Sequence, residues 1–128
     1  MRKMCTVSRG LAFAAAAGGG AILIGKAIAR SRTMESLRGK VVLITGGSRG
    51  LGLLLAREFA SRGCRVAICA RHADQLDRAR EDLARRGAGV WAGTCDVSDP
   101  EQVRQLMADL TAQFGPVDVL VNNAGIIQ

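Results

Sequence analysis

The 128-residue chain has no tyrosine and few aromatic residues of any kind, with three phenylalanines and one tryptophan. Proteins that bind single-stranded nucleic acids commonly stack the bases on aromatic side chains, so this scarcity argues against a nucleic-acid partner. His72 is the only histidine. We therefore expect neither a zinc site nor a serine triad that uses histidine.

The four cysteines, Cys5, Cys64, Cys69 and Cys95, show no C-x2-C spacing and have no histidine pair near them. This spacing gives no indication of a metal site. We expect small apolar core residues or reduced thiols, as in a cytosolic protein.

Positive charge is concentrated at the start of the chain. Residues 1–40 contain eight Lys or Arg and one Glu, which gives +7, whereas residues 41–128 contain ten basic and ten acidic residues, which gives zero. The basic excess of the whole chain therefore belongs to its N-terminal segment. The neutral net charge of residues 41–128 again argues against nucleic-acid binding.

A glycine-rich stretch lies between an expected strand and an expected helix. The β-branched run from Lys40 to Thr45 predicts a buried parallel strand. The helix expected from Leu51 to Phe59 would bury one face, made of Leu51, Leu54, Leu55 and Phe59. Between them, Gly46, Gly50 and Gly52 permit a sharp turn, a close approach to an anion and close packing of helix on strand. The N-terminus of such a helix attracts a pyrophosphate.

The rest of the chain alternates between expected strands and helices. Strands are expected at residues 65–70, 90–94 and 118–121. One helix has an inner stripe of Leu76, Ala79 and Leu83 and ends near Gly87, and a second begins at a capping box, Ser98-Asp99-Pro100-Glu101. The second helix carries an apolar face made of Val103, Leu106, Met107, Leu110 and Phe114. The pattern predicts the N-terminal half of a Rossmann-type, doubly wound parallel α/β sheet with strand order 3-2-1-4.

Three motifs stand in a fixed order: Thr45-Gly46-x3-Gly50-x-Gly52, then Asp96-Val97 after the third strand, then Asn122-Asn123-Ala124-Gly125 after the fourth. In these motifs the chain resembles the short-chain dehydrogenase/reductase family over residues 39–127. The resemblance implies that Asp96-Val97 contacts adenine and that the glycine-rich loop holds the pyrophosphate of a nicotinamide dinucleotide. The cofactor-binding residues expected are Thr45, Gly46, Ser48, Arg49, Gly50, Leu51, Gly52, Arg71, Asp96, Val97, Asn123, Ala124 and Gly125.

The resemblance also implies hydride transfer between the nicotinamide and a carbonyl or alcohol substrate. In that family a serine, a tyrosine and a lysine four residues after it act on the substrate oxygen. None of these positions falls within this chain, so we expect no catalytic residue in it and no activity from it alone. Substrate binding and homo-oligomer formation are expected only of a complete enzyme. The alternative is an inactive nucleotide-binding or membrane-tethered interaction fragment.

The residues after the second strand favour NADP over NAD. NAD-selective folds usually place a carboxylate there to hold the ribose 2′-hydroxyl, and a basic residue there accommodates a 2′-phosphate. This chain has Ala70-Arg71-His72, with no carboxylate until Asp74. Arg49 could reach the same phosphate from the loop. The alternative is that both arginines are solvated surface charges, in which case NAD remains possible.

Residues 1–38 are expected to form a separate segment, and residues 39–128 the partial nucleotide-binding domain. The uncharged run 10–25 would span about 24 Å as a helix, and about 30 Å if extended to Ala29, which is the thickness of a bilayer core. The first hypothesis is a membrane anchor over residues 10–29, with the following positive charge keeping the domain on the cytoplasmic side. A signal peptide ending at Ala27-Ile28-Ala29, followed by export, is a second reading. A transit segment or disordered tail on a cytoplasmic protein is a third.

Overall fold

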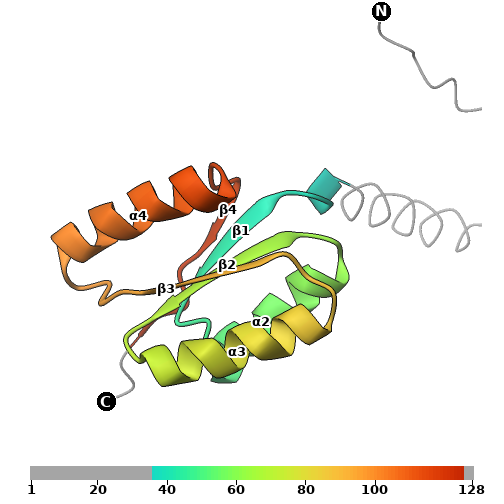
Figure 1. Ribbon diagram of the computed structural model, residues 1–128, viewed down its shortest axis with the longest axis horizontal. Helices are drawn as coiled ribbons and strands as arrows, with labels where there is room; N and C mark the ends of the chain where they lie inside the picture. Colours follow the sequence, from blue (N-terminus) through green and yellow to red (C-terminus); the bar gives the residue numbers. More distant parts are fainter. Residues whose placement is uncertain (1–35, 126–128) are drawn as a thin grey trace, which may run out of the picture. The chain divides into compact units, whose positions relative to one another are not determined.

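The computed structural model describes residues 36–125, of which residues 37–125 belong to one α/β unit. Strands and helices alternate along this part of the chain (Figure 1). In order they are β1 (Val41–Thr45), α2 (Gly50–Ser61), β2 (Arg65–Ala70), α3 (Ala73–Arg85), β3 (Val90–Thr94), α4 (Pro100–Phe114) and β4 (Val119–Val121).

The strands form a parallel sheet of order β3-β2-β1-β4, as the sequence predicts. Val41 of β1 is in register with Arg65 of β2, and Val66 of β2 with Val90 of β3. On the other side of β1, Val42 is in register with Val119 of β4. Since all four strands are parallel, their carboxyl ends lie at one edge of the sheet.

The sheet has helices on both faces (Figure 1). One core forms where α2 and α3 pack on Val42, Ile44, Val66 and Ile68 of the central strands. The second core lies under α4. The predicted inner stripe of α3, Leu76, Ala79 and Leu83, is buried, and so are Leu106 and Leu110 of the predicted face of α4. These two predictions are confirmed.

The predicted inner face of α2 is wrong in part. Leu51 and Leu54 are 63% and 57% exposed, and the buried residues of the helix are Gly52 and Ala56. The helix lies so close to the sheet that its contact line is made of small residues. Leu55 and Phe59 lie beside this line and pack at the edge of the core. A pattern based on hydrophobicity alone therefore misplaces the face, because it discounts Gly and Ala.

The N-terminal cap of α4 is also one residue away from the predicted position. The cap is Asp99, whose Oδ1 accepts hydrogen bonds from the backbone N–H groups of Glu101 at 2.9 Å and Gln102 at 3.4 Å. Gln102 returns a bond from its side chain to Asp99 Oδ2, at 2.9 Å. Ser98 instead bonds to Asp96. Asp99 thus caps the helix, with Gln102 bonded to its carboxylate, and Pro100 lies in the first turn as expected.

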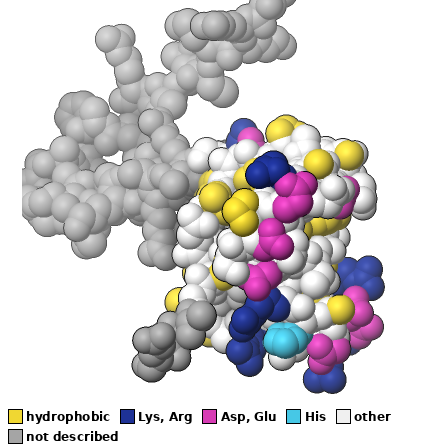
Figure 2. Space-filling view, turned by 90° about the vertical axis from the view of Figure 1, so that its left-hand side faces the viewer, with side chains coloured by type: hydrophobic (Ala, Val, Ile, Leu, Met, Phe, Trp, Pro, Cys, Tyr) yellow, Lys and Arg dark blue, Asp and Glu magenta, His cyan; other side chains and the backbone are white. Residues whose placement is uncertain are grey.

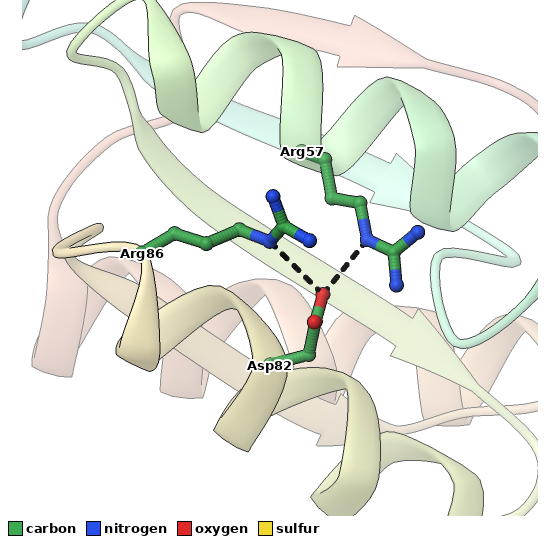
Figure 3. Close-up of polar contacts among 3 residues, drawn as sticks. All are labelled: Arg57, Asp82 and Arg86. Atoms are coloured by element: carbon green, nitrogen blue, oxygen red, sulfur yellow. Dashed lines mark hydrogen bonds and ion pairs between the residues drawn. The ribbon is translucent and has the colours of Figure 1, made fainter.

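An ion cluster joins α2 to α3 (Figure 3). Asp82 Oδ2 accepts from Arg57 Nε on α2 at 2.8 Å and from Arg86 Nε, just after α3, at 3.4 Å. The hydrogen bond from Arg57 is the main reason that the pKa of Asp82 lies below its usual value, and Arg86 lowers it further. The cluster fixes the two helices to each other on one face of the sheet.

No helix between residues 36 and 125 is long and apolar enough to cross a membrane. The hydrophobic segment predicted over residues 10–29, its helix and the anchor hypothesis lie outside the described residues.

Candidate functional site

The loop after β1 leaves the N-terminus of α2 open at the carboxyl edge of the sheet. Gly46 and Gly50 have positive φ angles of 66° and 54°, which glycine adopts without strain. Arg49 is the N-cap residue of α2, and its side chain makes no capping hydrogen bond; the first turn contains no acidic residue. The first N–H groups of the helix are therefore free of a side-chain cap, which suits them to an anion.

Two further glycines have no room for a side chain. A Cβ at Gly52 would lie 2.1 Å from the carbonyl oxygen of Gly46, so α2 can approach β1 this closely only with glycine at that position. A Cβ at Gly47 would lie 2.6 Å from Cγ2 of Ile68. Gly52 was among the predicted site residues and Gly47 was not, although the Gly46-Gly47 pair directly after the strand is a signal for a tight loop.

Thr45 joins the glycine-rich loop to the motif after β4. Its Oγ1 accepts hydrogen bonds from the backbone N–H groups of Asn123 and Ala124, each at 3.0 Å, and donates to the carbonyl of Val121 at 3.4 Å. Asn123 Nδ2 in turn donates to the carbonyl of Gly46 at 3.3 Å. The structure thus brings together two motifs that are 78 residues apart. Thr45 is 8% exposed, and its hydroxyl is occupied by these bonds, so it shapes the site from beneath.

Ser48 is buried in the loop, and its hydroxyl donates to Gln75 Oε1 on α3 at 3.4 Å. Gln75 was not among the predicted site residues. No sequence signal pointed to it, because its position depends on how α3 packs beside the loop. Arg49 and Leu51, on either side of Gly50, are both exposed, and Leu51 does not belong to the core.

Arg71 and Asp96 leave the sheet side by side, at the ends of β2 and β3. The two strands stay paired up to this point, since the N–H of Cys95 donates to the carbonyl of Ala70 at 2.9 Å. Asp96 Oδ1 accepts from the backbone N–H of Ser98 at 2.9 Å and from its hydroxyl at 2.7 Å. These bonds, and more weakly the charge of Arg71, hold the pKa of Asp96 below its usual value. Asp96 is therefore an ionised acceptor at neutral pH, next to the exposed side chain of Val97.

Figure 2 looks at this end of the molecule. Lys and Arg side chains lie beside the one histidine, and acidic side chains form a column above them. Of the remaining predicted residues, Gly125 lies at the end of the described chain, and a Cβ added there would meet no described atom within 4 Å.

The cysteines of the described chain, Cys64, Cys69 and Cys95, are buried and reduced. Burial raises the pKa of Cys69 to about 11, and it also raises the pKa of Cys95. Both thiols are therefore protonated and serve as core residues under α4, as expected. No cluster of metal-binding side chains occurs among residues 36–125.

Comparison with known proteins places this site in a family. The sequence model of the short chain dehydrogenases matches residues 40–128. A short chain dehydrogenase/reductase of Macrophomina phaseolina, dpmpG, is 46% identical over 100 residues, which is 77% of this chain and 57% of the relative.

Solved structures similar to this chain point to the same family. L-sorbose reductase from Gluconobacter frateurii, complexed with NADPH and L-sorbose, superposes with a TM-score of 0.69 at 39% identity, over 72% of this chain and 35% of that one. Actinorhodin polyketide ketoreductase with NADPH superposes with a TM-score of 0.67 at 40% identity, over 69% and 34% of the two chains. This chain thus spans between a third and somewhat over half of the length of these proteins. The chain belongs to the short chain dehydrogenase family.

Proposed function

We propose that the chain is the cofactor-binding part of an NADP(H)-dependent reductase of this family. The observation that carries the proposal is the convergence, at one edge of the sheet, of an uncapped helix N-terminus, a loop in which Gly47 and Gly52 have no room for a side chain, and the Thr45–Asn123 link. The solved relatives named above hold NADPH, which supports the same cofactor class here.

Each part of the edge would hold one part of the dinucleotide. The N–H groups at the start of α2 suit the pyrophosphate. The ionised Asp96 can accept from the amino group of adenine, and Val97 offers apolar surface to its ring. Arg49 and Arg71 supply two positive charges for the 2′-phosphate, while the hydroxyl of Ser48 stays bonded to Gln75 beneath the loop.

The complete enzyme would transfer a hydride between the nicotinamide and a carbonyl or alcohol. When bound, the nicotinamide supplies or accepts that hydride. A proton donor for the substrate oxygen would come from the family's tyrosine, and the 128 residues contain none. We therefore expect the chain alone to bind cofactor without oxidising NADPH in the presence of ketones.

The preference for NADP is tested by changing Arg71→Asp and titrating the chain with NADPH and NADH. The change should weaken NADPH binding by about tenfold to a hundredfold and leave NADH binding much less affected, because a charge-assisted contact to phosphate is lost. Arg85→Asp, an equal change of charge at the far end of α3, is the matched control and should leave both affinities as they are. An unchanged ratio of the two affinities in Arg71→Asp would refute the role of Arg71.

A further inference from the structure

The outer edge of β3 is open. β3 is the end strand of the sheet, and within the described part of the chain no strand lies beyond it. The N–H of Val66 donates to the carbonyl of Gly89, and the N–H of Cys95 to the carbonyl of Ala70, each at 2.9 Å. Since backbone groups alternate in direction along a strand, Val90, Ala92 and Thr94 direct their N–H and C=O groups away from β2.

Among the residues that the structure describes, this edge carries none of the features that usually protect an edge strand. Natural proteins guard such edges with lysine, proline, a bulge or a covering segment. The residues of β3, Val90-Trp91-Ala92-Gly93-Thr94, include no charge and no proline. The register with β2 runs unbroken over all five, so there is no bulge. The edge is therefore ready to pair with another strand.

We propose that two copies of this chain associate through β3, with the two strands antiparallel and related by a two-fold axis at Ala92. The three outward-facing residues are centred on Ala92, so a two-fold axis places each Val90 opposite the other copy's Thr94 and Ala92 opposite itself. All of these are hydrogen-bonded pairs of an antiparallel ladder, and every outward backbone group finds a partner.

The side chains on the α4 face also fit this symmetry. The indole of Trp91 covers Gly93, because a Cβ at Gly93 would lie 2.4 Å from Trp91 Cη2. In the two-fold pair, Trp91 of each copy lies opposite Gly93 of the other, beside the indole that already covers that glycine. An open groove of about 320 Å³ beside these residues, lined also by Gln105, Leu106 and Asp109, leaves room for the second indole.

Charge on the other face favours a second copy over an unrelated peptide. Arg80 and Glu81 of α3 border Val90 there, together with Ala84. Because Arg80 and Glu81 carry opposite charges, this side of the β3 edge does not favour a partner that is strongly charged with either sign. In the two-fold dimer, Arg80 and Glu81 of one copy would run in the opposite order to those of the other. The charges on this side of the edge are therefore complementary to themselves.

The experiment measures the mass of the 128-residue chain by light scattering, together with hydrogen exchange of single amides by NMR. We expect a dimer, with slow exchange at Ala92 and Thr94, whose amides have no partner within residues 36–125 of one copy. Ala92→Pro removes an outward N–H and no bond within the sheet, and Thr94→Lys adds a charge at the edge. Each variant should be monomeric, and Thr94→Lys should exchange rapidly at Ala92.

The matched control is Leu120→Lys, a charge placed on the exposed side chain of β4 at the opposite edge of the sheet. This variant should remain dimeric with slow exchange at Ala92. The proposal is overturned by rapid exchange at Ala92 and Thr94 in the unchanged chain. It is equally overturned by dimers of Thr94→Lys that keep the slow exchange, or by loss of the dimer in Leu120→Lys alone. None of these outcomes depends on cofactor binding.

Discussion

Single residues at the carboxyl edge of the sheet do more to shape the candidate site than to offer functional groups to a ligand. The hydroxyl of Thr45 is fully occupied by Val121, Asn123 and Ala124, and the amide of Asn123 holds the carbonyl of Gly46. Both residues were predicted from motifs. The bonds between them could not be, because they depend on β1 and β4 being neighbours in the sheet.

Gly52→Ala tests the closest of these contacts. The new Cβ would meet the carbonyl oxygen of Gly46, a backbone atom that can move only with the strand. We expect a loss of about 1–3 kcal/mol in the free energy of unfolding, typical of overpacking, and weaker NADPH binding. Denaturant unfolding measures the first and a titration the second.

Gly89→Ala is the control for that change, since a Cβ at Gly89 has its nearest neighbours at 3.9 Å. It should alter the free energy of unfolding by less than about 1 kcal/mol. Equal stability of Gly52→Ala and the unchanged chain would show that the loop tolerates a side chain there.

At the scale of elements, the sequence predicted the type and order of every strand and helix in the described α/β unit, because apolar runs of strand length alternate with segments of helical period along the chain. Where the prediction from the sequence was wrong or incomplete, the position of the residue depended on a contact between two elements. Small residues of α2, and not Leu51 or Leu54, face the sheet because the helix lies close to it. Gln75 reaches Ser48 only once α3 is packed beside the loop.

The cluster of Asp82 with Arg57 and Arg86 gives a pH-dependent prediction about the packing of α2 on α3. Because the folded-state pKa of Asp82 is lowered, its contribution to stability is present above the unfolded pKa and is lost as the pH falls through the folded pKa. Asp82→Asn should therefore cost about 1 kcal/mol at pH 7. This difference from the unchanged chain should shrink below about pH 4, as denaturant unfolding at several pH values would reveal.

Asp77→Asn removes an exposed partner of Arg80 on the same helix and serves as the control. It should change the free energy of unfolding by less than about 0.5 kcal/mol at either pH. A difference for Asp82→Asn that stayed constant down to pH 3 would show that its effect does not come from the carboxylate charge.

At the scale of the whole molecule, the membrane anchor expected over residues 10–29 stays a prediction. A fusion that begins at residue 1 should remain with membranes after carbonate extraction, whereas one that begins at Met34 should be released. A shortened product cut near Ala29 and recovered outside the cytoplasm would favour the signal peptide instead.

The proposed function depends on binding of the dinucleotide at the carboxyl edge of this sheet, and an NMR titration of the chain with NADPH measures this binding residue by residue. We predict that backbone signals shift in the glycine-rich loop 46–52, at Arg71, at Asp96-Val97 and at Asn123-Ala124, and that NADH shifts Arg71 less than NADPH does. Shifts confined to other surfaces, or no shifts at saturating NADPH with the fold intact, would show that the dinucleotide does not bind at this edge.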